Sequence, residues 1–327
     1  MGQGPSVSHE NSTIEYAAGS RKGSNSKVEN AFSPLLFQHR TILDLDGSSS
    51  TSFFGVYDGH GGADVALYCA NNFHRVLVND GDYKDNLDVA LKRAFTRMDE
   101  QMDQNDDWRT LANPPGVGVK LLCFPSTPPR VQGPPYVEGS TACVVVIRGN
   151  QIIIGNVGDS CCVLSRDDGR QAIELSTKHT PENEDERKII ENAGGQLLNA
   201  GGADLVNGIL PLTRAIGTFR FKSPSAGHIV TCIPDIDIAD ITHDTEYLLI
   251  ANRAFWDTTP ISSEMAVKYL RQYSGSYSVA SMCDKLLNLC RNPVDNLTLI
   301  LVYFKPSARL PRPAPPAPTN LSVPVVV

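Results

Sequence analysis

The run Asp58-Gly59-His60-Gly61-Gly62 has residue types that could do metal chemistry. It follows Phe53-Phe54-Gly55-Val56-Tyr57, an apolar stretch that predicts a short buried strand. Glycines let the backbone approach a ligand closely, and a carboxylate beside a glycine carbonyl offers the hard oxygen ligands that Mg²⁺ and Mn²⁺ prefer. A glycine turn capped by an aspartate is the alternative interpretation of this motif taken alone.

Two further carboxylates stand beside apolar stretches that predict strands. Asp159 follows one strand in Gly158-Asp159-Ser160, and Asp295 comes directly before the last apolar stretch. Each alone is more typical of a turn residue. If the three strand ends meet at one edge of a sheet, Asp58, Asp159 and Asp295 predict a dinuclear metal cluster, which would activate water for phosphoryl hydrolysis.

The elements that must position these residues can be read from hydrophobic periodicity. Helices are expected at 61–78, 85–103, 181–193, 262–273 and 278–290. Strands are expected at 33–44, 52–57, 141–148, 151–157, 162–165, 172–175, 228–233, 246–251 and 296–304. Hairpins and paired helices in this order predict an α+β fold, a four-layer α-β-β-α sandwich of two antiparallel sheets flanked by helices.

Composition divides the chain into three parts. Residues 1–27 are polar and predict a flexible N-terminal arm; residues 28–304 form the predicted domain, interrupted by a Pro/Gly-rich loop at 105–139; residues 305–327 form a Pro-rich tail. The tail's Pro-x-x-Pro spacing could dock an SH3-like domain, and a plain disordered tail is the alternative.

Charge and cysteine usage limit the partners and the compartment. The net charge is −7, so nucleic acid is not expected as a partner. No membrane span or secretory signal is predicted. The eight dispersed cysteines predict reduced thiols, as in a cytoplasmic or nuclear protein. The protein is expected to be a monomer. Met1-Gly2-Gln3-Gly4-Pro5-Ser6 fits the myristoylation template at Gly2. One acyl chain would add only weak peripheral membrane association, and an unmodified start is the alternative.

Taken in order, the motifs resemble the protein phosphatase 2C family of metal-dependent Ser/Thr phosphatases over about residues 29–304. The resemblance extends from Phe54–Gly62 through Gly139-Ser140-Thr141-Ala142, Asn156–Ser160, His179-Thr180-Pro181 with Glu184 and Arg187, Ala193-Gly194-Gly195, Leu212–Gly217 and Trp256-Asp257 to Asp295–Thr298. The short stretch Val28-Glu29-Asn30 is similar to that of plant members. The resemblance implies a central β-sandwich, up to two Mg²⁺ or Mn²⁺ ions, and attack of a metal-bridged hydroxide on phosphoserine or phosphothreonine.

The resemblance also implies roles for individual residues. Asp58 matches the carboxylate that bridges both metals, and Gly59 matches the ligand that uses its carbonyl. Asp295 matches a terminal ligand of the first metal, and Glu29 an acid that acts through metal-bound water. His60 matches the general acid for the leaving alcohol, and Asp159 matches an acid near a weak third metal.

Several site positions depart from the family pattern. Arg253 stands where a metal-ligating carboxylate is expected, Asn30 where a second acid should follow Glu29, and Asn25 at the position of the phosphate-binding arginine. Two further acids of the pattern are replaced, by Thr218 and Lys178. A guanidinium about 4 Å from a divalent cation would be repelled by about 8 kcal/mol at an effective dielectric of ~20.

These departures favour one of two functions. The first is a catalytically impaired or inactive phosphatase-like protein that acts as a binding module or decoy for a phosphorylated protein or a kinase. Arg253 would then bridge Asp58 and Asp295 in place of the metal. The alternative is an active Mn²⁺- or Mg²⁺-dependent Ser/Thr phosphatase that uses the remaining ligands.

Overall fold

Two antiparallel sheets form the centre of the molecule. The computed structural model describes residues 6–24, 38–48, 50–105, 108–112, 134–166, 169–223, 227–257 and 261–311. One sheet has six strands in the order β1 (Val7–Glu10), β2 (Ile14–Arg21), β18 (Leu297–Phe304), β17 (Tyr247–Ala251), β9 (Cys161–Arg166) and β10 (Gln171–Glu174). The other has five: β16 (Asp235–Asp240), β8 (Gln151–Val157), β7 (Ala142–Arg148), β4 (Thr51–Tyr57) and β3 (Gln38–Ile42).

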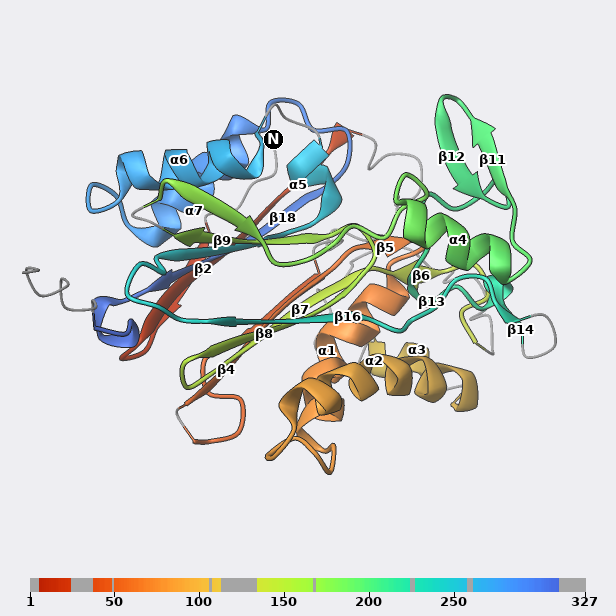
Figure 1. The fold of residues 1–327 in the computed structure, drawn as a ribbon, viewed down its shortest axis with the longest axis horizontal. Coiled ribbons are helices and arrows are strands. Elements are labelled where there is room, and N and C mark those ends of the chain that lie inside the picture. The colour runs from red at the N-terminus through yellow and green to blue at the C-terminus, as the bar shows by residue number, and fades with distance from the viewer. Residues whose placement is uncertain are drawn as a thin grey trace, which may run out of the picture.

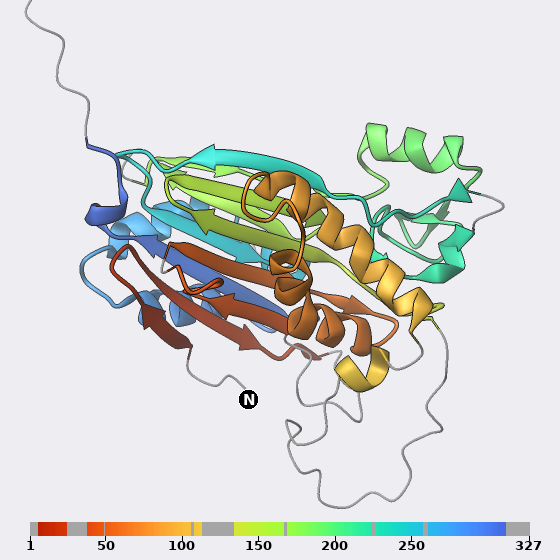
Figure 2. The same ribbon diagram turned by 90° about the horizontal axis from the view of Figure 1, so that it is seen from below.

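Helices cover the outer faces of both sheets, as Figure 1 shows. The five-stranded sheet carries α1 (Asp64–Val78), α2 (Leu87–Gln104) and α3 (Trp108–Ala112), which Figure 2 shows from below. The six-stranded sheet carries α5 (Arg253–Asp257), α6 (Ser263–Tyr273) and α7 (Val279–Leu289). Ser262 and Ser278 begin α6 and α7 by accepting backbone N–H groups that the first helical turn leaves unpaired.

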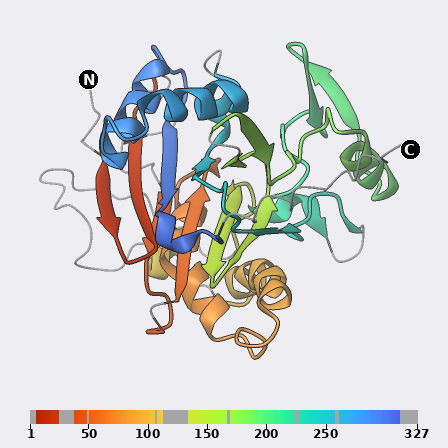
Figure 3. The ribbon, with the colours of Figure 1, turned by 60° about the vertical axis from the view of Figure 1, so that its left-hand side comes forward.

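Three apolar cores hold the four layers together. Phe54, Val145 and Ile300 belong to the core between the sheets, where the two sheets stack face to face (Figure 3). Phe53, from the same strand as Phe54, faces α1 and α2 instead, because successive strand side chains point to opposite faces. A third core lies between the six-stranded sheet and helices α5, α6 and α7. The predicted α-β-β-α sandwich is therefore confirmed.

A smaller unit extends beside the sandwich (Figure 1). It contains α4 (Glu184–Asn192), the hairpin of β11 (Leu197–Ala200) and β12 (Ala203–Val206), and the short pair β14 (Lys222–Ser223) and β15 (Gly227–His228). Its own apolar cluster includes Ile190, Val206, Leu212 and Phe221. Asn183 caps α4, and three acidic residues fill its first turn, as expected for a helix N-terminus.

The structure corrects three sequence expectations. Residues 14–21, expected in a flexible arm, form β2, which is largely buried and pairs with β18 along its whole length. The strand expected at 228–233 lies further along, as β16, whose alternation of aspartate and apolar residues marks a half-exposed edge strand. Within the expected loop at 105–139, residues 108–112 form the short helix α3 instead; residues 106–107 and 113–133 lie outside the described part of the chain, as does the tail from residue 312.

No helix among the described residues has the length and apolar character needed to cross a membrane.

Candidate functional site

Asp58 stands where β4 ends and the chain turns sharply. The next residues form β5 (Gly59–His60), which pairs with β6 (Gly139–Ser140), and β6 also pairs with β13 (Ile216–Gly217). Thr141 holds the Asp58 backbone from both sides: its N–H donates to the Asp58 carbonyl at 2.9 Å, and its hydroxyl accepts the Asp58 N–H at 3.2 Å. Gly61 has a φ of 67°, which favours glycine. The turn therefore holds Asp58 in a defined position.

The Asp58 carboxylate is partly buried and faces other acids. Desolvation and then the charge of Asp159 raise its pKa to about 7, with a smaller contribution from Asp295. The side-chain amide of Asn252 and the charge of Arg253 act in the opposite direction. Without a cation, this carboxylate therefore titrates near neutral pH, which is typical of functional sites but also of buried structural acids.

Asn252 is the direct neighbour of the Asp58 carboxylate. Its Nδ2 donates to Asp58 Oδ2 at 3.2 Å and to the Asn296 carbonyl at 2.8 Å, while its Oδ1 accepts the Thr298 N–H at 3.0 Å. Sequence reasoning missed this residue. A polar side chain directly after the apolar strand Tyr247–Ala251 and before Arg253 was the available signal.

Arg253 begins α5 and is directed toward a different pair of acids from the pair expected. Its Nε donates to Asp257 Oδ2 at 2.8 Å, and its Nη1 lies 3.7 Å from Asp159 Oδ2. No described ion pair joins it to Asp58 or Asp295. The hypothesis that its guanidinium bridges those two residues is therefore wrong; Asn252 binds Asp58 instead.

The charges around Arg253 form a compact ion-pair cluster. Lys178 also binds Asp257, with 2.9 Å between Nζ and Oδ1, so one carboxylate is shared by two cations. Asp159 is almost fully buried, and burial raises its pKa to about 6 despite the opposing charge of Arg253. Two side chains that depart from the family pattern, Arg253 and Lys178, thus supply the positive charge beside these acids.

Asp295 lies on the rim of the site and is exposed. The adjacent segment is tied to the N-terminal part of the chain: Asn296 Oδ1 accepts the Gly23 N–H at 3.0 Å, and the Pro293 carbonyl accepts the Ser24 N–H at 2.9 Å. Four of the expected site residues lie outside the described part of the chain: Gly2, Asn25, Glu29 and Asn30.

His60 has an environment that keeps its imidazole neutral. Burial, followed by the charge of Lys222, lowers its pKa to about 4. Its Nε2 shares a hydrogen bond of 2.9 Å with Thr218 Oγ1, and its Nδ1 is buried without a described partner. At neutral pH the imidazole is therefore uncharged in this arrangement, with a proton on one of its two ring nitrogens.

Thr218 is held beside His60 in a strained backbone conformation. Its φ is 57°, which is unusual for a β-branched residue. The neighbouring Gly217 donates its N–H to Asp99 Oδ1 at 2.7 Å, and the other oxygen of Asp99 binds the buried Lys222 ammonium. This buried pair anchors β13, the strand that directly precedes Thr218.

The described residues fit a two-metal centre poorly. Among them, no group of three or more His, Cys, Asp or Glu side chains is arranged to hold a metal ion. Asp58 and Gly59, the ligands expected from the sequence, lie at the end of β4, and the Arg253 guanidinium adds positive charge beside the nearby Asp159.

Comparison with known proteins agrees with the fold and the motif order. The profile described as "Protein phosphatase 2C" matches residues 16–295. The chain is 42% identical over 318 residues to "Probable protein phosphatase 2C 21" of Oryza sativa subsp. japonica, covering 93% of this chain and 87% of that protein. It is 35% identical to "Probable protein phosphatase 2C 21" of Arabidopsis thaliana, with 90% and 88% covered.

Among solved structures, the crystal structure of a serine-threonine phosphatase 2C from Toxoplasma gondii superposes with a TM-score of 0.72 at 16% identity. The match covers 93% of this chain and 98% of that chain, and at this identity it supports the fold alone. The four layers and the metal-type turn thus define a phosphatase 2C-like sandwich. With the profile and the plant relatives, the chain belongs to the protein phosphatase 2C family.

Proposed function

We propose that this protein is a catalytically impaired phosphatase 2C that binds a phosphorylated protein or a kinase rather than turning it over efficiently. The proposal rests on the position of the Arg253 guanidinium, which forms an ion pair with Asp257 and lies beside Asp159. In this family a carboxylate is expected at that position. The change adds two units of positive charge where a divalent cation would need negative charge.

Two further contacts support a reduced affinity for metal. Asn252 donates an amide hydrogen to Oδ2 of Asp58, which would leave that carboxylate less available to a cation. Lys178 adds a second positive charge through Asp257. The cluster can therefore keep its acids compensated without any metal, so the fold would persist in an enzyme that has lost most of its activity.

The test measures hydrolysis of p-nitrophenyl phosphate by the purified full chain with Mn²⁺ or Mg²⁺. We expect very low turnover in the wild type, and an increase of about tenfold or more in Mn²⁺-dependent turnover for Arg253→Asp. Arg253→Gln is the matched control, because it removes the positive charge without supplying a ligand. Efficient wild-type turnover that is lost in Asp58→Ala would overturn the proposal.

The alternative function is an active Mn²⁺- or Mg²⁺-dependent Ser/Thr phosphatase. It is favoured by Asp58, whose turn is intact and whose raised pKa reflects a carboxylate that a bound cation would stabilise. Under this alternative, Asp58 and Gly59 would hold one ion together with Glu29 acting through water, and His60 would protonate the leaving group. Calorimetric titration with Mn²⁺ separates the two functions, because tight binding of two ions per chain is expected only of the active enzyme.

We also propose that the chain is myristoylated at Gly2, which is tested separately from its activity. Myristate on Gly2 would give the chain weak peripheral membrane association, since one acyl chain is only a marginal anchor. Mass spectrometry of the protein from eukaryotic cells, compared with Gly2→Ala, checks the modification. A monomer in the cytoplasm or nucleus is expected otherwise.

A further inference from the structure

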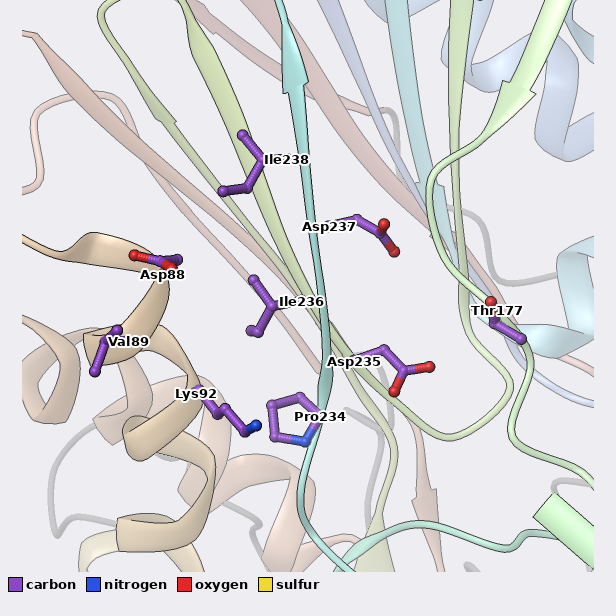
Figure 4. A pocket seen from close by; sticks show the side chains of 9 residues that line it. All are labelled: Asp88, Val89, Lys92, Thr177, Pro234, Asp235, Ile236, Asp237 and Ile238. Atoms are coloured by element: carbon purple, nitrogen blue, oxygen red, sulfur yellow. The ribbon is translucent and has the colours of Figure 1, made fainter. Parts of the chain in front are cut away.

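We propose that the free edge of β16 is a docking groove for an extended, basic segment of another protein, which adds to the five-stranded sheet as a sixth strand. A cavity of about 730 Å³ opens between this edge and the start of α2 (Figure 4). It is lined by Asp88, Val89 and Lys92 of α2, by Thr177, and by residues 234–238. The proposal concerns a surface outside the candidate metal site and does not depend on catalytic activity.

Part of the outer edge of β16 has backbone groups without a described partner, although the Asp240 carbonyl accepts a hydrogen bond from the Arg166 guanidinium at 2.8 Å. Asp240 pairs with Gln151 of β8, and the same register continues to Ile241, whose N–H donates to the Asn150 carbonyl at 2.8 Å. In an antiparallel ladder, alternate residues direct both backbone groups to the same neighbour. Ile236 and Ile238 therefore direct their N–H and C=O groups away from β8, where an added strand could pair with them.

The two sides of this edge differ in chemistry. Ile236 and Ile238 point toward α2, whereas Asp235 and Asp237 point toward Thr177 (Figure 4). Ile238 is 52% exposed and Val89 is 44% exposed, so apolar surface remains open on the helix side. An added strand with apolar and basic residues in alternation would place its apolar side chains on the isoleucines and its basic ones on the aspartates.

The charge of the β16 edge indicates which kind of segment would bind there. Asp235 already binds His179 and Arg214, but the Asp237 carboxylate has no hydrogen bond or ion pair in the described part of the chain. Burial and the neighbouring Asp235 raise the pKa of Asp237, so a cation beside it would be stabilising. A second copy of this chain is disfavoured, because edge-to-edge pairing of two β16 strands brings their aspartates together.

The probe for the test is a labelled, end-blocked peptide of about nine residues that alternates lysine and valine. Fluorescence anisotropy with the full chain should show saturable binding that weakens as salt is added. A peptide that alternates glutamate and valine is the charge control. Failure of the lysine peptide to bind at concentrations up to about 1 mM, or equal binding of both peptides, would overturn the proposal.

Two variants of the protein test the two parts of the surface separately. Asp237→Lys reverses the charge, and Ile238→Pro removes an outward N–H without removing a bond to β8. Each should weaken binding of the lysine peptide by about tenfold or more. Glu100→Lys, an equal charge reversal at an exposed position of α2, should leave binding unchanged. Circular dichroism checks folding, and amide exchange provides an independent measurement in the wild type.

In amide exchange on the wild type, the peptide should slow exchange at Ile236 and Ile238. Binding that is insensitive to both variants, or that leaves these two amides unprotected, would contradict strand addition at β16. If Glu100→Lys also lost binding, the weaker binding of the variants would reflect the overall charge of the protein. That result would also overturn the proposed groove.

Discussion

A single guanidinium changes the chemistry of the candidate site. Arg253 lies between Asp159 and Asp257, and those acids would repel each other if it were removed. In this chain the negative charges of Asp159 and Asp257 are compensated by Arg253 and Lys178. Under the proposed function, this exchange of a ligand for a counterion preserves the fold while lowering its affinity for metal.

Arg253→Asp should make the metal-free protein less stable, because it places a new carboxylate beside Asp159 and Asp257. We expect a fall of several degrees in the midpoint of thermal unfolding, in proportion to a loss of about 1–2 kcal/mol. Added Mn²⁺ should restore the midpoint in this variant and have little effect on the wild type. Arg253→Gln serves as the control. If Mn²⁺ stabilised Arg253→Gln as strongly as Arg253→Asp, the new carboxylate would not be acting as a ligand.

At the scale of elements, buried polar links connect the site to the edge of the sandwich. His179 donates its backbone N–H to the Gly158 carbonyl at 3.0 Å, and its ring Nδ1 accepts the Gly158 N–H at 3.1 Å. The other ring nitrogen binds Asp235 of β16, which also binds Arg214. Arg214 in turn binds Glu186 of α4, so one network joins the residue before Asp159 to β16 and to the smaller unit.

Asp235→Asn should lower the free energy of unfolding by about 1–2 kcal/mol at neutral pH. This loss is smaller than for a fully buried carboxylate, because solvent screens the partly exposed Asp235. The hydrogen bond from His179, and then Arg214, lower the pKa of Asp235 to about 2. A depressed carboxylate pKa gives stability that is present above its unfolded value near 4 and is lost as pH falls toward 2.

Urea unfolding of both proteins between about pH 3 and 7 checks this prediction. The difference in stability should be constant above about pH 5 and should narrow below about pH 4. A difference that keeps its size through this range would mean that shape, rather than charge, accounts for the effect of the substitution.

At the scale of the whole molecule, three apolar cores bury every cysteine that the structure describes. These are Cys69, Cys143, Cys161, Cys162, Cys232, Cys283 and Cys290, all of them free thiols. Burial raises the pKa of Cys161, Cys232 and Cys283 to about 12 in each case. The reactive thiolate is therefore scarce in the folded protein.

The seven described cysteines should react with a disulfide reagent such as DTNB only when the protein unfolds. Labelling at pH 8 followed by mass spectrometry of peptides should find them unmodified in the native state and fully modified in guanidinium chloride. Prompt native labelling of Cys143 or Cys162, which lie between the sheets, would contradict the close packing of the sandwich.

The sequence by itself determined the fold class and the residues that form the metal-type turn. Its period-two and helical patterns are local properties, and the position of glycines beside Asp58 follows from backbone sterics that act over a few residues. Arg253 was visible as a departure for the same reason, since it stands next to Trp256-Asp257 in an ordered motif.

Only the tertiary structure decided that Arg253 lies beside Asp159, that Asn252 binds Asp58, and that residues 14–21 form a strand paired with β18 inside the six-stranded sheet. These contacts join residues that are far apart in the chain: Asn252 and Asp58 differ by 194 positions. Local propensity carries no information about such pairs, because their geometry depends on how the two sheets pack and where each strand ends. The charge balance of the site, on which its chemistry depends, is for this reason a property of the folded molecule.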